Sequence, residues 1–169
     1  MYIKNRSLNK LMNTPSITTE LVRNLITQQF PQWKDLRIQP VAVSGWDNRT
    51  FHLGDRMSVR LPSANIYADK IKKEYVWLPL LAPHIPTVTI PRPLALGKPS
   101  PEYPWPWAIY QWIKGESLNT IDHQAIDMMK LAQDIGFFLR DLQKITTVQA
   151  ENIAPGPYNF YRGAHPKIY

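Results

Sequence analysis

Near the start of the chain, apolar residues recur three and four positions apart, which is the spacing of one helix face. These residues are Leu21, Val22, Leu25 and Ile26. Either Ser16 or Thr18 is suited to cap the amino end of such a helix, and Pro31 is suited to end it. The pattern predicts a helix over residues 19–29.

From Arg37 onward the apolar period changes to two, which is typical of strands. Residues 37–43 and 49–53 predict two strands joined by a polar loop. Gly54 and Asp55 then separate the second strand from a third at residues 56–61, and a two-residue turn that begins with glycine predicts a type II′ hairpin. This part of the chain therefore predicts a three-stranded antiparallel meander.

The third strand and the helix after it place one cation and one carboxylate at unusual positions. Arg60 faces away from the main apolar side of its strand, because strand side chains alternate. Residues 63–78 predict a helix in which Glu74 is the one carboxylate in an apolar stripe. A carboxylate that faces a core is costly unless a cation pairs with it. We therefore expect an ion pair between Arg60 and Glu74.

The proline-rich middle of the chain predicts two further strands. One is expected near residues 87–96 and the other, strongly apolar, at residues 107–113. After Gly115, Asp122 is suited to cap a long helix with an apolar stripe, and residues from Val148 onward are typical of loop. Five strands with a helix after the third predict an α+β fold.

Composition narrows the classes of protein. The chain has 169 residues, of which 44% are hydrophobic and 20% charged, as expected of a folded domain with a core of its own. There is no cysteine, which excludes disulfides and thiolate chemistry, and the four histidines are far apart, so we expect no metal site. No apolar run is long enough to span a bilayer and no secretory signal is visible, so we expect a cytoplasmic protein without a membrane partner.

The net charge of +7 is unevenly distributed along the sequence. Residues 1–73 hold 12 Lys and Arg against 5 Asp and Glu, whereas residues 74–169 hold 8 of each. An excess of this kind suits an anionic partner, either a nucleic acid or a small phosphate ligand. The basic residues are dispersed, so charge alone does not decide between the two.

A meander with a polar loop, a cation on the third strand and an aligned glutamate on the next helix is the layout of a kinase nucleotide lobe. Five segments within about residues 18–161 closely resemble the aminoglycoside phosphotransferase family of small-molecule kinases. They are Val43-Ser-Gly-Trp-Asp-Asn-Arg-Thr-Phe-His-Leu-Gly54, Ser58-Val-Arg-Leu-Pro62, Glu74-Tyr-Val-Trp-Leu-Pro79, Ile90-Pro-Arg-Pro93 and Ile109-Tyr-Gln-Trp-Ile-Lys-Gly-Glu116. The resemblance implies a kinase-like lobe over residues 1–110, preceded by an amino-terminal helix, and a hinge with the incomplete start of a helical lobe over residues 111–169.

The resemblance also implies roles for individual residues in binding ATP. Arg60 stands where kinases carry the cation that holds the α- and β-phosphates, and Glu74 stands where a glutamate orients that cation. The loop expected to cover the phosphates consists of Ser44, Gly45, Trp46, Asp47 and Asn48. The hinge expected to hydrogen-bond adenine consists of Tyr110, Gln111, Trp112 and Ile113. For Asp47 and Asn48, simple turn chemistry is an equal alternative, and Trp46 is suited to cover the nucleotide or to contact a missing lobe.

Members of the family carry a His-Gly-Asp loop, whose aspartate is the catalytic base, followed by metal-binding residues. No His-Gly-Asp occurs before the sequence ends at Tyr169, so we expect no catalytic or metal-binding residue in this chain and no turnover by it alone. Mg²⁺ is expected to bind with ATP only when the missing lobe is supplied. The expected partner is a separate chain that carries this lobe, or a second copy of this chain through self-association. The alternative is a basic module that binds nucleic acid or protein and has no nucleotide site. The sequence contains no nucleic-acid recognition motif, so we do not expect a nucleic-acid partner.

Overall fold

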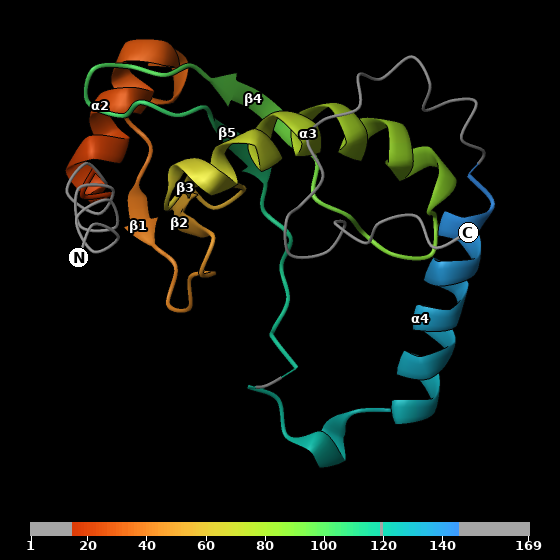
Figure 1. The fold of residues 1–169 in the computed structure, drawn as a ribbon. Coiled ribbons are helices and arrows are strands. Elements are labelled where there is room, and N and C mark those ends of the chain that lie inside the picture. Colours follow the sequence, from red (N-terminus) through yellow and green to blue (C-terminus); the bar gives the residue numbers. More distant parts are fainter. Residues whose placement is uncertain (1–14, 119, 146–169) are drawn as a thin grey trace, which may run out of the picture.

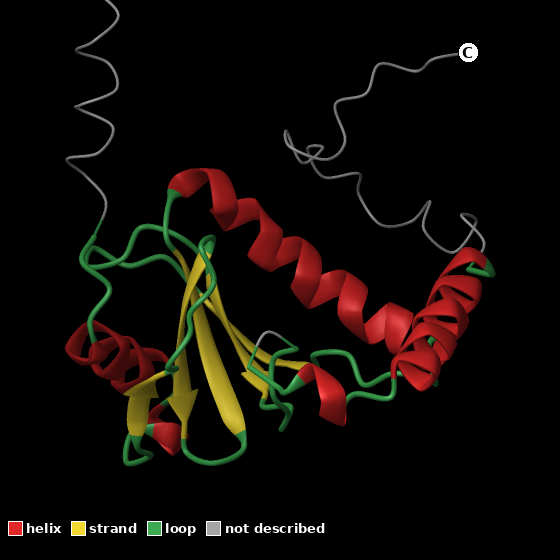
Figure 2. Ribbon diagram, turned by 90° about the horizontal axis from the view of Figure 1, so that it is seen from below, coloured by secondary structure: helices red, strands yellow, loops and turns green. Residues whose placement is uncertain are grey.

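The computed structural model describes residues 15–118 and 120–145. A five-stranded antiparallel sheet, in the order β1-β2-β3-β5-β4, lies between helices α2 and α3, while α4 stands at the far end of α3 (Figures 1 and 2). The strands are β1 (Ile38–Pro40), β2 (Asn48–Leu53), β3 (Met57–Pro62), β4 (Pro93–Gly97) and β5 (Trp107–Gln111). The predicted α+β fold with a five-stranded sheet is confirmed.

The helices are α2 (Thr19–Gln29), α3 (Asn65–Leu81) and α4 (Met128–Gln143), with 3₁₀ turns η1 (Pro31–Trp33), η2 (Ala82–His84) and η3 (His123–Ala125). The bounds of α2 agree with the prediction, and its cap is Thr18, whose hydroxyl accepts a hydrogen bond from the Leu21 amide at 3.2 Å. No helix in the described ranges is long and apolar enough to cross a membrane.

The sheet buries both of its faces, each against a different helix. Phe51, Val59 and Ile109 lie side by side on neighbouring strands and pack with the apolar stripe of α2 in the larger core. On the opposite face, Ala108 and Tyr110 pack against Ile71 of α3 in a smaller core. Because side chains alternate along a strand, this register places Arg60 on the α3 face, next to Ala108.

The connection between β2 and β3 differs from the prediction. Leu53 pairs with Met57, so the turn contains the three residues Gly54, Asp55 and Arg56 rather than the two of a type II′ hairpin. Gly54 has a φ of 59°, a conformation that glycine adopts without steric cost. The extra turn residue moves the start of the third strand from Arg56 to Met57 and leaves Arg60 on its predicted face.

The predicted strand at residues 87–96 is correct only at its end. β4 begins at Pro93 and is irregular between Pro93 and Ala95. The prolines of this stretch have no backbone N–H to donate to a ladder, which explains why the paired segment is short. Gly97, its last residue, packs against the fully buried ring of Trp107.

The cap predicted for the long helix after Gly115 was placed wrongly. Asp122 instead accepts a hydrogen bond from the Gln124 amide at 3.0 Å, at the short η3 turn, and Asp127 caps α4 by accepting from the Lys130 amide at 2.9 Å. The intervening residues are used by η3, a turn that the sequence pattern does not distinguish from a first helical turn.

Candidate functional site

Arg60, Glu74 and Tyr110 form one hydrogen-bonded group between the sheet and α3. An Nη atom of Arg60 donates to Oε2 of Glu74 at 2.8 Å, so the predicted ion pair is present. The Tyr110 hydroxyl donates to the same oxygen at 3.0 Å. The arginine and glutamate side chains are 27% and 31% exposed, which leaves the pair at the edge of the core and open to solvent on one side.

The loop at residues 44–48 closes on itself through backbone and side-chain hydrogen bonds. The Ser44 hydroxyl donates to the Asn48 carbonyl at 2.9 Å and accepts from the Thr50 amide at 3.1 Å. Arg49 donates to the Gly45 carbonyl at 3.2 Å. These bonds give the connection between β1 and β2 a defined shape, with Ser44 at its centre.

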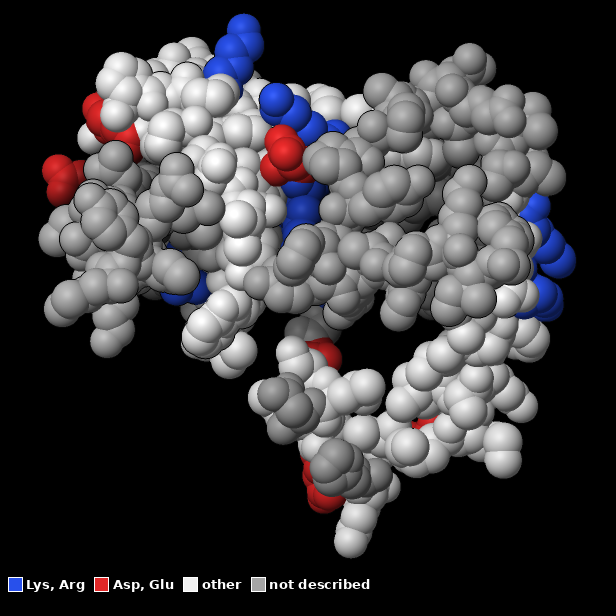
Figure 3. Space-filling model, viewed as in Figure 1, with Lys and Arg blue, Asp and Glu red and all other residues white. Residues whose placement is uncertain are grey.

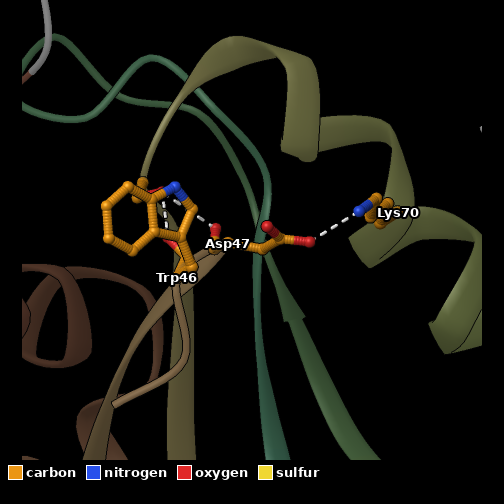
Figure 4. Close-up of polar contacts among 4 residues, drawn as sticks. Trp46, Asp47 and Lys70 are labelled. Atoms are coloured by element: carbon orange, nitrogen blue, oxygen red, sulfur yellow. Dashed lines mark hydrogen bonds and ion pairs between the residues drawn. The ribbon is translucent and has the colours of Figure 1, made fainter. Parts of the chain in front are cut away.

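The same loop is attached to the start of α3. The Ser63 hydroxyl donates to the carbonyls of Trp46 and Asp47, at 2.9 and 3.1 Å, and the Lys70 ammonium donates to the Asp47 carboxylate at 2.6 Å. Figure 4 shows the Asp47 side chain directed toward Lys70, while the Trp46 ring points the other way. Trp46 is 86% exposed. Sequence reasoning did not predict that Ser63 and Lys70 attach this loop to α3.

Asn48, the first residue of β2, is buried, and its amide oxygen has no hydrogen-bond partner in the described part of the chain. A buried acceptor without a donor is uncommon in folded proteins. Of the two interpretations of Asp47 and Asn48, turn chemistry accounts for the backbone bonds of Asp47. It does not account for the buried amide of Asn48.

The four predicted hinge residues fall into two groups. Tyr110 and Gln111 are the last residues of β5, and only Trp112 and Ile113 follow the sheet. The amides of Gln111 and Trp112 donate to the carbonyls of Arg92 and Arg56, both at 2.8 Å. The amide of Ile113 makes no backbone hydrogen bond to any described residue, so it is the one of these three that a ligand could use.

A cavity of about 390 Å³ lies beside this hinge. Its lining residues are Arg37, Gln39, His52, Gly54, Asp55, Trp112 and Lys114. The rings of His52 and Trp112 meet edge to face, with their centroids 4.2 Å apart. Ligand pockets commonly have volumes of roughly 300–1,000 Å³, so this hollow is large enough for part of a small ligand.

Burial, and next the negative charge of Glu74, raises the pKa of the Tyr110 hydroxyl far above its ordinary value. The phenol therefore stays protonated and keeps donating to Glu74 throughout the pH range in which proteins fold. No cluster of three or more His, Asp or Glu side chains suited to a metal ion occurs in residues 15–118 and 120–145.

A comparison with known protein families shows to which family the chain belongs. The model of the phosphotransferase enzyme family matches residues 37–164. The chain belongs to this family. No curated protein matches the chain.

Solved structures of aminoglycoside phosphotransferases share the fold of this phosphotransferase family member. Aminoglycoside 2′-phosphotransferase-IIIa in its GDP complex is 24% identical with a TM-score of 0.68, and the similarity covers 79% of this chain and 44% of that one. A complex of that enzyme type with GDP and kanamycin is 25% identical with a TM-score of 0.64, covering 76% and 43%. The ADP-bound aminoglycoside phosphotransferase APH(2″)-Ib is 20% identical with a TM-score of 0.53, covering 77% and 41%. The chain thus spans less than half the length of these relatives.

These similarities confirm that the sheet and helices form the amino-terminal, kinase-like part of the phosphotransferase fold. On the face drawn in Figure 3, basic and acidic side chains of the described residues are scattered rather than gathered into one patch of a single sign.

Proposed function

We propose that this chain is the nucleotide-binding part of an ATP-dependent small-molecule phosphotransferase. The observation that carries the proposal is the Arg60–Glu74 pair, formed between β3 and α3 at a partly solvent-open position. Arginine has five N–H donors, and only one nitrogen of Arg60 is bonded to Glu74. The remaining donors suit the α- and β-phosphates of ATP, because a guanidinium binds phosphate through paired, charge-assisted hydrogen bonds.

The loop at residues 44–48 supports the same assignment. It lies beside the amino end of α3 and is fixed there through Ser63 and Lys70, as Figure 4 shows. In this proposal the loop covers the phosphates of ATP, with Ser44, Gly45, Trp46, Asp47 and Asn48 as its residues. A loop fixed in advance loses little conformational freedom when it closes on a ligand.

The adenine end is assigned to the hinge. The amide of Ile113 is the donor proposed for a ring nitrogen of the base, because the amides of Gln111 and Trp112 are already bonded within the protein. The adjacent cavity, bounded by Trp112 and His52, offers an aromatic wall for the base. Base and phosphates thereby meet different elements of the fold, the hinge and the β3–α3 pair.

We propose no catalytic or metal-binding role for any residue of the chain. Phosphoryl transfer needs a residue that orients the acceptor hydroxyl and carboxylates or amides that hold Mg²⁺. ATP with Mg²⁺ supplies the phosphoryl group. The resemblance implies that a His-Gly-Asp motif supplies the catalytic residue, and this motif is absent from residues 1–169. We therefore expect this polypeptide to bind ATP without transferring phosphate.

The proposal extends to a protein partner, either a separate chain that carries the catalytic loop or a second copy of this chain. One side of α4 has an apolar stripe that no described residue covers. Exposure in this stripe is 63% for Met128, 49% for Ile135, 47% for Leu139 and 38% for Leu142. Light scattering of the purified chain distinguishes the partners, since a dimer that Ile135→Glu dissociates supports self-association and a monomer supports the separate chain.

The nucleotide site is tested by calorimetric titration of MgATP and of MgGTP into the folded chain. We expect ATP to bind and Arg60→Ala to weaken binding by about tenfold or more, the loss of a charge-assisted contact. Arg23→Ala is the matched control, because Arg23 lies on α2, on the other side of the sheet, where its side chain donates to the Lys34 carbonyl at 3.3 Å. The control should bind ATP as the unmodified chain does.

Two outcomes would contradict the proposal. One is a folded chain that binds neither nucleotide, and the other is equal binding by the Arg60→Ala variant and the unmodified chain. Salt-sensitive binding of oligonucleotides that ATP does not displace would favour the basic interaction module instead.

A further inference from the structure

The ring and the hydroxyl of Tyr110 lie in different surroundings: the ring packs among apolar side chains, and the hydroxyl makes a polar contact. The residue is almost fully buried, and its ring packs with Ile71 and Ala108, beside Leu78 and Leu96. Phenylalanine would fill this space equally well, because all four neighbours are apolar. The hydroxyl is therefore the part of Tyr110 that calls for an explanation beyond packing.

The hydroxyl ends at the carboxylate that holds Arg60. It donates to Oε2 of Glu74 at 3.0 Å, the same atom that accepts from Arg60 at 2.8 Å. A carboxylate oxygen has two lone pairs, so one atom can accept both bonds. The phenol thus contacts Glu74 from β5 while Arg60 contacts it from β3.

The ring also touches the guanidinium directly. The central carbon of the Arg60 guanidinium lies 5.2 Å from the centroid of the Tyr110 ring, within the range of a cation–π contact. Arg60 is consequently held by Tyr110 in two ways, through Glu74 and over the aromatic face. A cation held this way keeps its unbonded N–H groups in a fixed direction before any ligand arrives.

We infer that Tyr110 is a positioning residue, whose hydroxyl orients Glu74 and, through it, Arg60 for the phosphate groups of a nucleotide. The inference rests on the proposed function, and assigns to Tyr110 a task other than backbone contact with the base. Its effect should therefore appear in the binding of phosphates and be absent from the binding of the nucleoside.

Tyr110→Phe tests this inference, because it removes the hydroxyl and keeps the ring. Tyr103→Phe is the matched control: Tyr103 is also fully buried, and its hydroxyl donates to the Pro62 carbonyl at 2.7 Å, in the core on the α2 side of the sheet. The first measurement needs no nucleotide. It follows the Nε–H signal of the Arg60 side chain by NMR, identified by its loss in Arg60→Lys.

In Tyr110→Phe we expect the order of the Arg60 side chain to fall below that in the unmodified chain, because one of its two links to residue 110 is lost, whereas Tyr103→Phe leaves it unchanged. We expect MgATP to bind roughly three- to tenfold more weakly to Tyr110→Phe, the equivalent of one hydrogen bond. The affinity for adenosine should stay the same. If Tyr110→Phe does not fold, Glu74→Gln tests the same link from its other end and should release Arg60 likewise.

The outcomes separate this inference from the proposed function. An Arg60 signal that is equally ordered in the unmodified chain and in Tyr110→Phe, or in Glu74→Gln where Tyr110→Phe does not fold, would overturn the inference whatever binds. Equal loss of adenosine and MgATP affinity would overturn it too, because it would indicate a role at the base. If the unmodified chain binds no nucleotide, the proposed function fails, and the NMR measurement still decides whether Tyr110 orients Arg60.

Discussion

The carboxylate of Asp47 lies 2.6 Å from the ammonium of Lys70, and this contact joins the loop between β1 and β2 to helix α3. The two side chains are 41% and 31% exposed, so water and salt screen their attraction. Hydrogen bonds from the Ser63 hydroxyl to the carbonyls of Trp46 and Asp47 hold the same loop without any charge. The ion pair therefore directs the loop more than it stabilises the fold.

We expect Lys70→Met to lower the free energy of unfolding by less than about 1 kcal/mol, as is usual for exposed ion pairs. Urea unfolding in low and high salt checks this, and the difference between the variant and the unmodified chain should shrink as salt is added. By contrast, Ser63→Ala removes both hydroxyl bonds to the loop, and amide exchange of residues 44–48 should speed up more in this variant than in Lys70→Met.

Position 97 is predicted to tolerate no side chain, because the backbone of Gly97 packs directly against the Trp107 ring. A Cβ atom at position 97 would lie 2.0 Å from a ring carbon of Trp107, a side chain without any exposure. We expect Gly97→Ala to destabilise the fold by about 1–3 kcal/mol or more, the range for overpacked cores. Thermal unfolding measures the effect. Gly115→Ala is the control, since a Cβ there meets nothing within 4 Å, and equal melting temperatures for the two variants would contradict the prediction.

Ile113 is predicted to contribute its backbone and not its side chain to nucleotide binding. Ile113→Pro removes the N–H group proposed to bond the base, and calorimetry should show a loss of affinity for both adenosine and MgATP. Ile113→Ala keeps the N–H group, and because the isoleucine side chain is 37% exposed, its removal should change affinity little. Weaker binding by the alanine variant alone would assign the contact to the side chain.

The contact between α4 and the segment after α3 is predicted to weaken in acid. The hydrogen bond from the Arg140 side chain, with smaller contributions that include Thr87, lowers the pKa of Asp141. A carboxyl whose pKa is lower in the folded state stabilises that state above the pKa of the unfolded chain, and this contribution is lost as the pH falls through the folded pKa. The loss is therefore expected below about pH 4.

Amide exchange of α4 as a function of pH measures this effect. In the unmodified chain, protection of the α4 amides should decrease as the pH is lowered below about 4, since the ordinary pKa of aspartate is about 3.9. Asp141→Asn carries no titrating group at this position and should show weaker protection that depends less on pH. A variant with the same pH profile as the unmodified chain would assign the acid sensitivity to another carboxyl.

Much of the fold could be predicted from local patterns. The bounds of α2 follow from its helical spacing, the Thr18 cap and Pro31, all of which act within a few residues. The Arg60–Glu74 pair could also be predicted, because strand alternation sets the direction of one side chain, and the cost of an unpaired carboxylate near a core requires a cation for the other. Family resemblance then predicted the purpose of the pair, an assignment that stays a proposal.

Tertiary packing decided what these local patterns left open. Periodicity did not determine the length of the β2–β3 turn, and the short η3 turn displaced the cap of α4 from Asp122 to Asp127. The hydroxyl of Tyr110 meets Glu74 across 36 positions, and Lys70 meets Asp47 across 23. Contacts this distant in sequence arise only once α3 packs on the sheet, because their geometry depends on the angle and depth of that packing. The sequence by itself thus determined the elements and their one required ion pair, and the packed structure decided which further groups surround it.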